Sequence, residues 1–411
     1  MLKNYLLTAW NVLMRRKLFT AINLVCVVLT LVVLMVFTAL LESAFYPSGV
    51  EGKSDRMLQV ITIAASGPHT STTSPLGYKV VEQYLKPMKS LERVAATTLA
   101  RAVSVYQGAT VSELMMRRTD ADYWKVLDFT VLAGRVLNDD DLAQGRFVAV
   151  INASSARRLF PAGAALGQKI NVAGQLFEVC GVVEDALQVN AYADIWAPIT
   201  TLPSSAYRQQ FSGEFTAILL ARSAADLPQI RREVAAIAKS VVFDDPQTLN
   251  RAVFWADSKL DLFARLSVGD TDVPDSGAAT VLALIGAAML LFMLLPALNL
   301  VNLNTGRIAE RSAEIGVRKA FGATSAQLMV QLVIENVVLC LAGGLIGLAC
   351  TAGVLWWLEG SGLIPYLKIH LNFTVFCYGL VITLVFGVLS GVLPAWKMAR
   401  LDPVHALKGA A

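Results

Sequence analysis

Charged residues are scarce in this sequence. Of its 411 residues, 16% are Asp, Glu, Lys or Arg and 55% are hydrophobic, whereas soluble domains have about 25% charged and about 45–50% apolar residues. The net charge of +4 comes from Lys and Arg that gather at the ends of hydrophobic runs. This pattern indicates a membrane protein and gives no indication of a nucleic-acid partner.

Residue groupings that carry chemistry are absent from the sequence as well. No Gly-x-Ser-x-Gly or His-Glu-x-x-His motif occurs. Residues 52–54 (Gly-Lys-Ser) look like the end of a phosphate-binding loop, but Pro47 stands where that motif needs its first glycine. The histidines are isolated and lack metal-ligand spacing; they are His69, His370 and His405. We therefore expect no catalytic residue, no metal site and no cofactor bound by this chain.

Four hydrophobic runs are long enough to cross a bilayer, which takes roughly 20 mostly apolar residues. They cover residues 18–41, 278–303, 328–358 and 373–396. The first run follows Arg15, Arg16 and Lys17 as a signal peptide would, but it exceeds a signal core of about 7–15 residues. No small-x-small cleavage site follows it, so we expect an uncleaved span.

The positions of Lys and Arg predict the orientation of these spans, because cytoplasmic loops are enriched in both. They gather in residues 1–17, 304–327 and 397–411, whereas the loop 359–372 holds only Lys368. Both termini and the loop 304–327 are therefore expected in the cytoplasm. The predicted fold class is an integral membrane protein with four helices and an α+β extracytoplasmic domain, residues 42–277, inserted between the first and second helices.

The segment 42–277 alternates strand and helix patterns. Expected strands cover 57–63, 91–99, 147–151, 167–172, 176–183, 195–199 and 215–222, and expected helices cover 75–85, 153–159 and 227–241. A β-rich subdomain at about 104–205 is expected to be inserted into an α/β subdomain. We expect the acidic run 139–141 to be a solvated loop or a helix start. Of the five cysteines only Cys180 falls in this segment, which excludes a disulfide framework there.

The loop 304–327 has the pattern of a short amphipathic helix, a turn and the start of a long helix. Glu314 and Arg318 are spaced for an attractive pair on one helix face. Gly322 fits a helix end, and Thr324 can cap the next helix. On spacing alone, a helix lying at the lipid headgroups and a helix that docks on a partner are equally supported.

This loop resembles the signature of the FtsX-like permease family, R-x-x-E-I-G-V-R-K-A-x-G-A-T, and reads here R-S-A-E-I-G-V-R-K-A-F-G-A-T from Arg311 to Thr324. In the family, a Glu follows within the first turns of the next helix, and here it is Glu335. Pro394-Ala395 and the run from Ala399 to Pro403 resemble the close of the family's last span. The opening from Leu6 to Arg15, within an amphipathic N-terminal helix at 1–17, is also similar.

The segment 42–277 is similar to the periplasmic core domain of MacB-type transporters. The motifs that carry this resemblance follow in the same order and lie at 122–127, 132–135, 139–141, 148–151, 158–161, 167–170 and 177–183. Together the two resemblances cover most of the chain. They are strong indicators of the family and weak indicators of the substrate.

The resemblance implies the permease subunit of an ABC transporter in the bacterial inner membrane. ATP and Mg would be used by a separate ATPase subunit, and two permease copies, or two related permeases, would assemble with it. A periplasmic adaptor and an outer-membrane channel would be further partners, besides membrane lipids. ATP-driven motion would pass to the outside domain through the coupling helix, whose contacts the resemblance assigns to Arg311, Glu314, Ile315, Arg318, Lys319, Phe321 and Gly322.

Small and polar residues in the spans suggest how the helices pack. Two Gly-x-x-x-Gly pairs permit close helix approach, although glycine is common in any span; they are Gly343 with Gly347 and Gly387 with Gly391. Asn299 is placed to hydrogen-bond across helices. Glu335 is either a functional acid or a carboxylate that reaches the membrane edge or pairs with Arg307 or Arg318.

Export or efflux of a substrate is the function that the MacB-like motif order favours. Two alternatives stay open at this point: a lipoprotein-releasing permease, and an FtsX-type regulator that activates a cell-wall hydrolase and transports nothing.

Overall fold

The computed structural model describes residues 14, 17–45, 49–107, 110–161, 163–243, 245–269, 272–310, 317, 321, 324–363 and 373–399; within the helices, side chains such as those of 295–297 and 299–310 lie outside this description. The chain forms two compact units. Unit 1 comprises Met1–Glu42 and Leu282–Ala411, and unit 2 comprises Ser43–Val281. The predicted N-terminal helix falls almost wholly outside the described residues.

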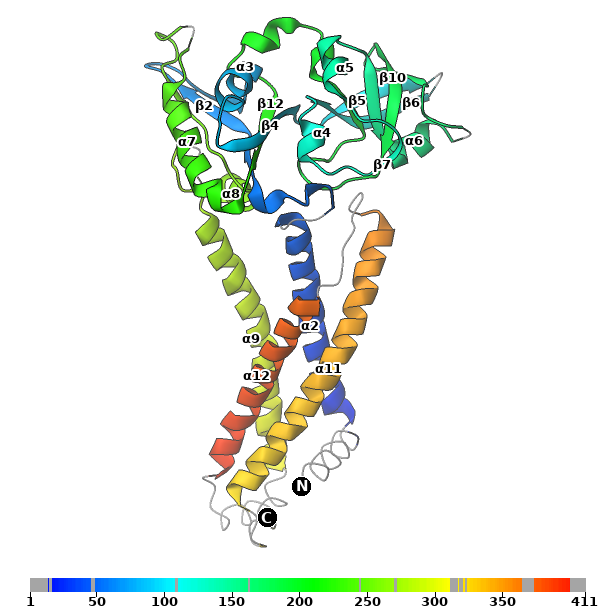
Figure 1. Ribbon diagram of the computed structural model, residues 1–411. Helices are drawn as coiled ribbons and strands as arrows, with labels where there is room; N and C mark the ends of the chain where they lie inside the picture. Colours follow the sequence, from blue (N-terminus) through cyan, green and yellow to red (C-terminus); the bar gives the residue numbers. More distant parts are fainter. Residues whose placement is uncertain are drawn as a thin grey trace. The chain divides into compact units, whose positions relative to one another are not determined.

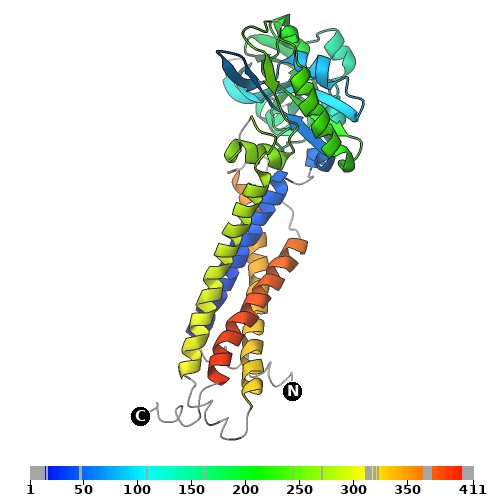
Figure 2. The ribbon, with the colours of Figure 1, turned by 90° about the vertical axis from the view of Figure 1, so that its left-hand side faces the viewer.

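Unit 1 is built from long apolar helices (Figures 1 and 2). They are α2 (Lys17–Phe45), α9 (Ala278–Glu310), α11 (Ser325–Ser361) and α12 (Phe373–Ala399), and each contains one of the four predicted runs. By length and composition, Thr20–Phe45 and Met329–Ser361 could cross a membrane, while the apolar stretches described in α9 and α12, Ala278–Leu294 and Phe376–Val385, are shorter. The count of four spans therefore stays a prediction.

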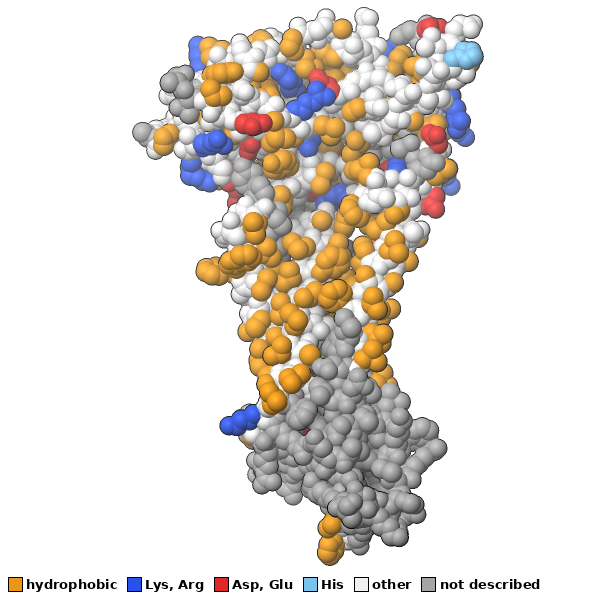
Figure 3. Space-filling view, turned by 180° about the vertical axis from the view of Figure 1, so that it is seen from behind, with side chains coloured by type: hydrophobic (Ala, Val, Ile, Leu, Met, Phe, Trp, Pro, Cys, Tyr) orange, Lys and Arg blue, Asp and Glu red, His pale blue; other side chains and the backbone are white. Residues whose placement is uncertain are grey.

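The two units differ in the side chains that they expose. On the face drawn in Figure 3, hydrophobic side chains cover the described part of the helices, whereas Lys, Arg, Asp and Glu side chains gather on unit 2. Within unit 1, α2 buries one side chain every four residues: Asn23, Val27, Leu31, Met35 and Ala39. Helix α11 repeats the same spacing from Gln331 to Leu355.

Unit 2 contains a small closed barrel. Its strands are β5 (Arg101–Gln107), β6 (Thr110–Thr119), β8 (Val148–Asn152), β9 (Lys169–Val172), β10 (Gln175–Val183) and β11 (Ile195–Pro198). They pair in the order β6-β11-β8-β10-β9-β5, and β5 pairs with β6 to close the ring. Apolar side chains from every one of these strands fill the interior.

A second group of strands continues the same sheet. It consists of β1 (Met57–Val60), β12 (Phe215–Ala221) and β4 (Leu91–Thr98), and the step from β4 to the barrel strand β6 rests on the single pair Thr97–Thr119. Helix α7 (Leu227–Ser240) packs Ile230, Val234 and Ala238 into the core beside these strands.

The remaining elements of unit 2 are short. They include β2 (Thr62–Ser66), β3 (Ser71–Pro75) and β13 (Arg251–Val253), which form a second sheet, the edge strand β7 (Val131–Gly134), and helices α3 (Tyr78–Val80), α4 (Tyr123–Val126), α5 (Asp139–Ala143), α6 (Ala153–Leu159) and α8 (Lys259–Ser267). The predicted strand 57–63 is in fact two strands of different sheets. The predicted helix at 75–85 begins only at Tyr78, because Pro75 still belongs to β3.

The acidic run 139–141 is a helix start, as one of the two interpretations had it. Asn138 caps α5, and its side chain accepts a hydrogen bond from the N–H of Asp141. The Asp141 carboxylate is buried, and Arg135 Nη2 donates to it at 2.8 Å. Part of the run is therefore structural rather than solvated.

Candidate functional site

Within the coupling loop, by which we mean the segment Arg311–Gly322, two residues belong to the described structure: Val317 and Phe321. The N–H of Phe321 donates to the carbonyl of Val317 at 3.0 Å, the spacing of one helical turn. The Phe321 side chain is 89% exposed. The other candidate contacts lie outside the described residues; they are Arg311, Glu314, Ile315, Arg318, Lys319 and Gly322. An aromatic ring exposed to this extent at the end of a helical turn is available to a partner surface.

Thr324 begins helix α11, as the sequence predicted. Its hydroxyl accepts a hydrogen bond from the N–H of Gln327, and the Gln327 side chain accepts one from the N–H of Thr324. This reciprocal pair satisfies two backbone donors that a helix start would otherwise leave unpaired. The end of the coupling loop is thus fixed to the first turn of a helix that continues for 37 residues.

Helices α2 and α11 meet at the first pair of glycines. A Cβ atom on Gly343 would lie 2.6 Å from Val27 Cγ1, and one on Gly347 would lie 3.3 Å from Leu31 Cβ. One turn further along both helices, Thr351 Oγ1 lies 3.8 Å from Met35 Sδ. Because the residue numbers rise along both helices from one contact to the next, the two helices run parallel. Their four-residue stripes give close backbone approach, which is how helices associate where lipid replaces water.

The second pair of glycines, Gly387 and Gly391, lies in α12, and the surroundings of both residues are outside the described part of the chain. Nearer the start of α12, Gly379 approaches Leu31 and Leu34 of α2. Gly344 of α11 faces Leu380, where an added Cβ would lie 2.6 Å from the Leu380 Cδ1 atom. Glycine positions therefore join α11 and α12 as well, and the roles of Gly387 and Gly391 stay predictions.

Glu335 is 2% exposed within α11. Gln331, one turn earlier, donates from Nε2 to Glu335 Oε1 at 3.2 Å, and Asn336 beside it is buried too. The carboxylate therefore lies inside the helix cluster. Pairing with Arg307 or Arg318 stays a prediction, because those side chains lie outside the described residues, as does the side chain of Asn299.

Asn23 is a buried polar residue that the sequence reasoning missed. It is 1% exposed in the stripe of α2, and among the residues that the structure describes neither its Oδ1 nor its Nδ2 finds a hydrogen-bond partner. A signal was available, since Asn23 is the one carboxamide in the run 18–41. A buried amide without a partner costs about 1–3 kcal/mol.

The junction between the barrel and the rest of unit 2 holds a buried acid, Asp120. Its carboxylate accepts hydrogen bonds from the N–H groups of Ala96 at 2.9 Å and Tyr123 at 3.0 Å, and Lys86 Nζ lies 3.3 Å away. Burial raises the pKa of Asp120 to about 6, against the opposing effect of Lys86 and the two N–H donors. The junction thus carries a group that titrates in the mildly acidic range.

Metal chemistry finds no support in the described part of the chain, where no group of three or more His, Cys, Asp or Glu side chains could hold an ion. The Cys180 thiol in unit 2 is free, and burial raises its pKa to about 11. The described residues therefore form packed helices and a domain with a polar surface.

Comparison with known families matches both parts of the chain. Residues 20–237 match the MacB-like periplasmic core domain, and residues 286–403 match the FtsX-like permease C-terminal region. The first match alone covers more than half of the chain.

Known proteins are similar to this chain over most of its length. The uncharacterized ABC transporter permease YknZ of Bacillus subtilis strain 168 is 26% identical over 348 residues, which are 84% of this chain and 82% of that protein. The permease YvrN of the same organism is 23% identical over 95% of this chain and 96% of its own length. The macrolide export ATP-binding/permease protein MacB of Escherichia coli strain K12 is 25% identical over 70% of this chain but only 42% of its own length.

Solved structures that resemble the chain cover about half of it. The periplasmic region of MacB from Actinobacillus actinomycetemcomitans gives a TM-score of 0.36 at 16% identity, over 46% of this chain and 87% of that one. The extracellular domain of YknZ gives 0.36 at 16% identity, over 47% of this chain and 98% of that one. The family assignment rests on the sequence matches: the chain belongs to the MacB/FtsX-like permease family of ABC transporters.

Proposed function

We propose that this chain is the non-catalytic membrane subunit of an ABC exporter, which passes the motion of a partner ATPase to unit 2. One observation carries the proposal. A MacB-like core domain at 20–237 is followed in the same chain by an FtsX-like permease region at 286–403 that contains the loop 304–327. An outside domain and a segment suited to an ATPase are thereby joined by apolar helices.

The ATPase is proposed as a separate subunit that binds the ATP and Mg. The MacB proteins of Mannheimia succiniciproducens and Escherichia coli are named as ATP-binding/permease proteins, and this chain matches 47% and 42% of their length. Within the 411 residues, no complete phosphate-binding loop occurs. A second permease copy, a periplasmic adaptor and an outer-membrane channel complete the proposed assembly, and their support is the family resemblance.

The proposed topology has four spans in the inner membrane, both termini in the cytoplasm and unit 2 in the periplasm. Its support is the distribution of Lys and Arg, which favours the cytoplasm for residues 1–17, 304–327 and 397–411. The four apolar runs lie in four helices, α2, α9, α11 and α12.

The coupling contact is proposed for the segment from Arg311 to Gly322. Glu314, Arg318 and Lys319 would form its polar contacts with the ATPase, and Ile315 and Phe321 its apolar ones. The exposure of Phe321 supports this role, because a large aromatic ring open to solvent is typical of an interface residue.

A charge reversal tests the coupling contact. The double variant Glu314→Lys, Arg318→Glu keeps the pair on its own helix but reverses the charges that a partner would meet. We expect the co-purifying ATPase to be lost, and with it the ATP hydrolysis of the complex. The measurement is pull-down of the full chain from membranes, followed by an ATPase assay.

A matched control uses the exposed cross-strand pair Lys169 and Glu178 on strands β9 and β10. Its reversal, Lys169→Glu with Glu178→Lys, should leave both ATPase binding and ATP hydrolysis intact. Unchanged ATPase binding by the Glu314 and Arg318 variant would show that the coupling contact lies elsewhere.

A further inference from the structure

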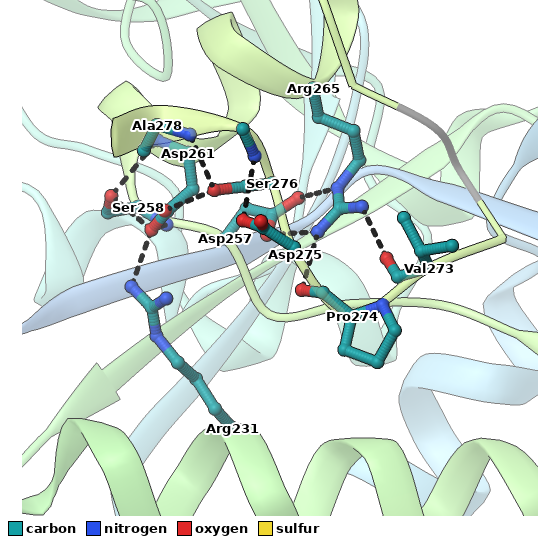
Figure 4. Close-up of polar contacts among 11 residues, drawn as sticks. Arg231, Asp257, Ser258, Asp261, Arg265, Val273, Pro274, Asp275, Ser276 and Ala278 are labelled. Carbon is teal, nitrogen blue, oxygen red and sulfur yellow. Dashed lines mark hydrogen bonds and ion pairs between the residues drawn. The ribbon is translucent and has the colours of Figure 1, made fainter. Parts of the chain in front are cut away.

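Helix α8, nine residues long, contacts several other parts of unit 2 through its side chains (Figure 4). Three of these side chains are charged and partly or fully buried: Lys259, Asp261 and Arg265. So short a helix has little stability of its own, so its position is set by what these side chains bind.

Asp261 connects α8 to the start of helix α9. Ser276 Oγ donates to Asp261 Oδ1 at 2.7 Å, and the same hydroxyl accepts a hydrogen bond from the N–H of Ala278, the first residue of α9, at 3.3 Å. The other carboxylate oxygen accepts from Ser258 Oγ, which caps α8, and pairs with Arg231 of α7. One carboxylate thus joins α7, α8 and the first turn of α9.

Arg265 connects α8 to the sheet and to the segment before α9. Its Nε donates to Asp257 at 2.8 Å, and its Nη1 donates to the carbonyl of Val273 at 2.8 Å. Asp257 in turn exchanges two backbone hydrogen bonds with Gln59 in the middle of strand β1, at 2.8 and 2.9 Å. The guanidinium therefore lies between the sheet and the chain that enters α9.

Two further contacts connect α8 to Phe45 at the end of helix α2 and to Glu51 in the short turn Gly49–Glu51 that follows it. The ring of Phe263 packs edge-on against Phe45, the last residue of α2, with 5.4 Å between the ring centroids. Lys259 Nζ lies 2.7 Å from Glu51 Oε2, and this carboxylate is fully buried. Glu51 also accepts a hydrogen bond from the N–H of Asn190 at 2.8 Å, which fixes it to the loop before strand β11.

Close backbone packing leaves little freedom at the end of α8. A Cβ atom on Gly269 would lie 2.7 Å from the Cα of Arg265 and 2.8 Å from the carbonyl oxygen of Ser276. Both neighbours are backbone atoms, so that no side chain fits at this position. Gly269, which follows α8, is consequently packed between Arg265 of α8 and Ser276, which precedes α9.

The stability of unit 2 does not explain why so many charged side chains are buried around α8. Buried ion pairs often contribute no more than apolar residues of the same volume would, because removing both charges from water is costly. What such ion pairs add is a fixed orientation, because carboxylate and guanidinium groups bind their partners in a defined geometry. The arrangement suits an element that must keep several segments in register.

We propose that α8 is the coupling element of unit 2, through which displacement of α2 or α9 reaches strand β1 and helix α7. The proposal rests on the proposed function, because the displacement originates in the partner ATPase. Lys259, Asp261 and Arg265 are its positioning residues. The chain enters unit 2 after α2 and leaves it into α9, and within unit 2 helix α8 contacts Phe45 and Ser276, which stand next to these two connections in the sequence.

The test compares hydrogen–deuterium exchange in the full chain with its co-purified ATPase, without nucleotide and with ATP plus vanadate. In the unmodified complex we expect a nucleotide-dependent change in exchange in peptides covering β1 and α7. Ser276→Ala separates α9 from Asp261, and Lys259→Met separates Glu51 from α8. Each should reduce that change at least threefold. Without nucleotide, exchange of Ser276→Ala should stay as in the unmodified complex, whereas Lys259→Met, which leaves the Glu51 carboxylate buried without its cation, should raise exchange only in peptides next to Lys259 and Glu51.

Two kinds of control show whether the loss comes from coupling. The Ser223 hydroxyl accepts a hydrogen bond from the N–H of Ala225 at 3.2 Å, as the Ser276 hydroxyl does from Ala278, and Ser223→Ala should keep the full change. The conservative variants Lys259→Arg and Ser276→Thr retain the donors and should keep most of it.

The outcomes separate this proposal from the proposed function. If no ATPase co-purifies, or if the unmodified complex shows no nucleotide-dependent change, the proposed function itself fails. If the unmodified complex responds and both Ser276→Ala and Lys259→Met respond fully, α8 is not the coupling element. Raised exchange throughout unit 2 in both variants without nucleotide would also overturn the proposal, because α8 would then serve stability alone.

Discussion

Unit 1 and unit 2 bury polar groups in different ways. In unit 2 several buried charges meet partners of opposite charge, as Arg265 meets Asp257 and Lys259 meets Glu51. In the described part of unit 1, the contact of α2 with α11 consists mainly of aliphatic side chains and glycines, and Asn23 is buried there with an unpaired amide. Directional polar contacts therefore add to the apolar core of unit 2, whereas the contact of α2 with α11 depends mainly on the fit of apolar side chains against glycines.

This difference follows from what surrounds each unit in the proposed topology. Helices in lipid gain little from burying apolar surface against each other, so that close packing at small residues decides how they associate. A domain in water gains from apolar burial and can bury charges where each finds its partner. The following substitutions test this comparison.

The largest effect is expected at Arg265. Arg265→Met leaves the Asp257 carboxylate buried without its partner, which typically costs about 3–5 kcal/mol. Denaturant unfolding of the full chain in detergent, followed by tryptophan fluorescence, measures the change in unfolding free energy. The double variant with Asp257→Asn should recover part of the loss. A loss below about 1 kcal/mol would mean that this pair behaves as an exposed one.

Asp120 should give unit 2 a pH dependence. Its pKa is raised to about 6 from an ordinary 3.8, so the folded state binds the proton more tightly than the unfolded state. The unfolding free energy should therefore fall by about 3 kcal/mol, relative to Asp120→Asn, as the pH rises from about 4 to above 6. Unfolding of both proteins across this range measures the difference. A constant difference would place the pKa of Asp120 near its ordinary value.

Gly343→Ala should weaken the contact between α2 and α11 by about 1–3 kcal/mol. The added methyl group would meet Val27 Cγ1, and a valine side chain cannot turn away easily. Unfolding in SDS followed by circular dichroism measures the loss. Gly353→Ala, where nothing lies within 4 Å of the added atom, is the control. Combining Gly343→Ala with Val27→Ala should restore much of the stability, and failure to do so would contradict this account of the contact.

The smallest effect is expected at Asn23, and it has the opposite sign. Asn23→Leu removes a buried amide without a partner in the described part of the chain, so the same SDS titration should show a gain of about 1 kcal/mol. Thr30→Val is the matched control, since the Thr30 hydroxyl already donates to the Cys26 carbonyl at 2.8 Å. A loss of stability with Asn23→Leu would show that the amide is used in a way that the described contacts lack.

The regular elements were predictable where periodicity is strong. The helix expected at 227–241 is α7, and the turn at Ala173-Gly174 joins β9 to β10. Residues 57–63 misled because apolar and β-branched residues predominate along the whole run, and such a run does not reveal that β1 and β2 belong to different sheets. Strands β5 and β6 were missed because polar or charged residues interrupt the apolar ones in both.

The polar contacts of α8 could not be predicted from one sequence. Lys259 and Glu51 lie 2.7 Å apart in space but are separated by most of the domain in the chain. Nothing in either local pattern indicates the other residue. The glycine pair at 343 and 347 was visible in the sequence, but its partner helix α2 was not.

The most direct test of the central claim is whether unit 2 responds to nucleotide on the partner ATPase. Hydrogen–deuterium exchange of the complete complex, with and without ATP plus vanadate, measures this response in every peptide of residues 43–281. We expect a change in exchange at β1, α7 and α8 that Glu314→Lys with Arg318→Glu abolishes. Identical exchange in both nucleotide states, in a complex that hydrolyses ATP, would contradict the claim that motion passes from the ATPase to unit 2.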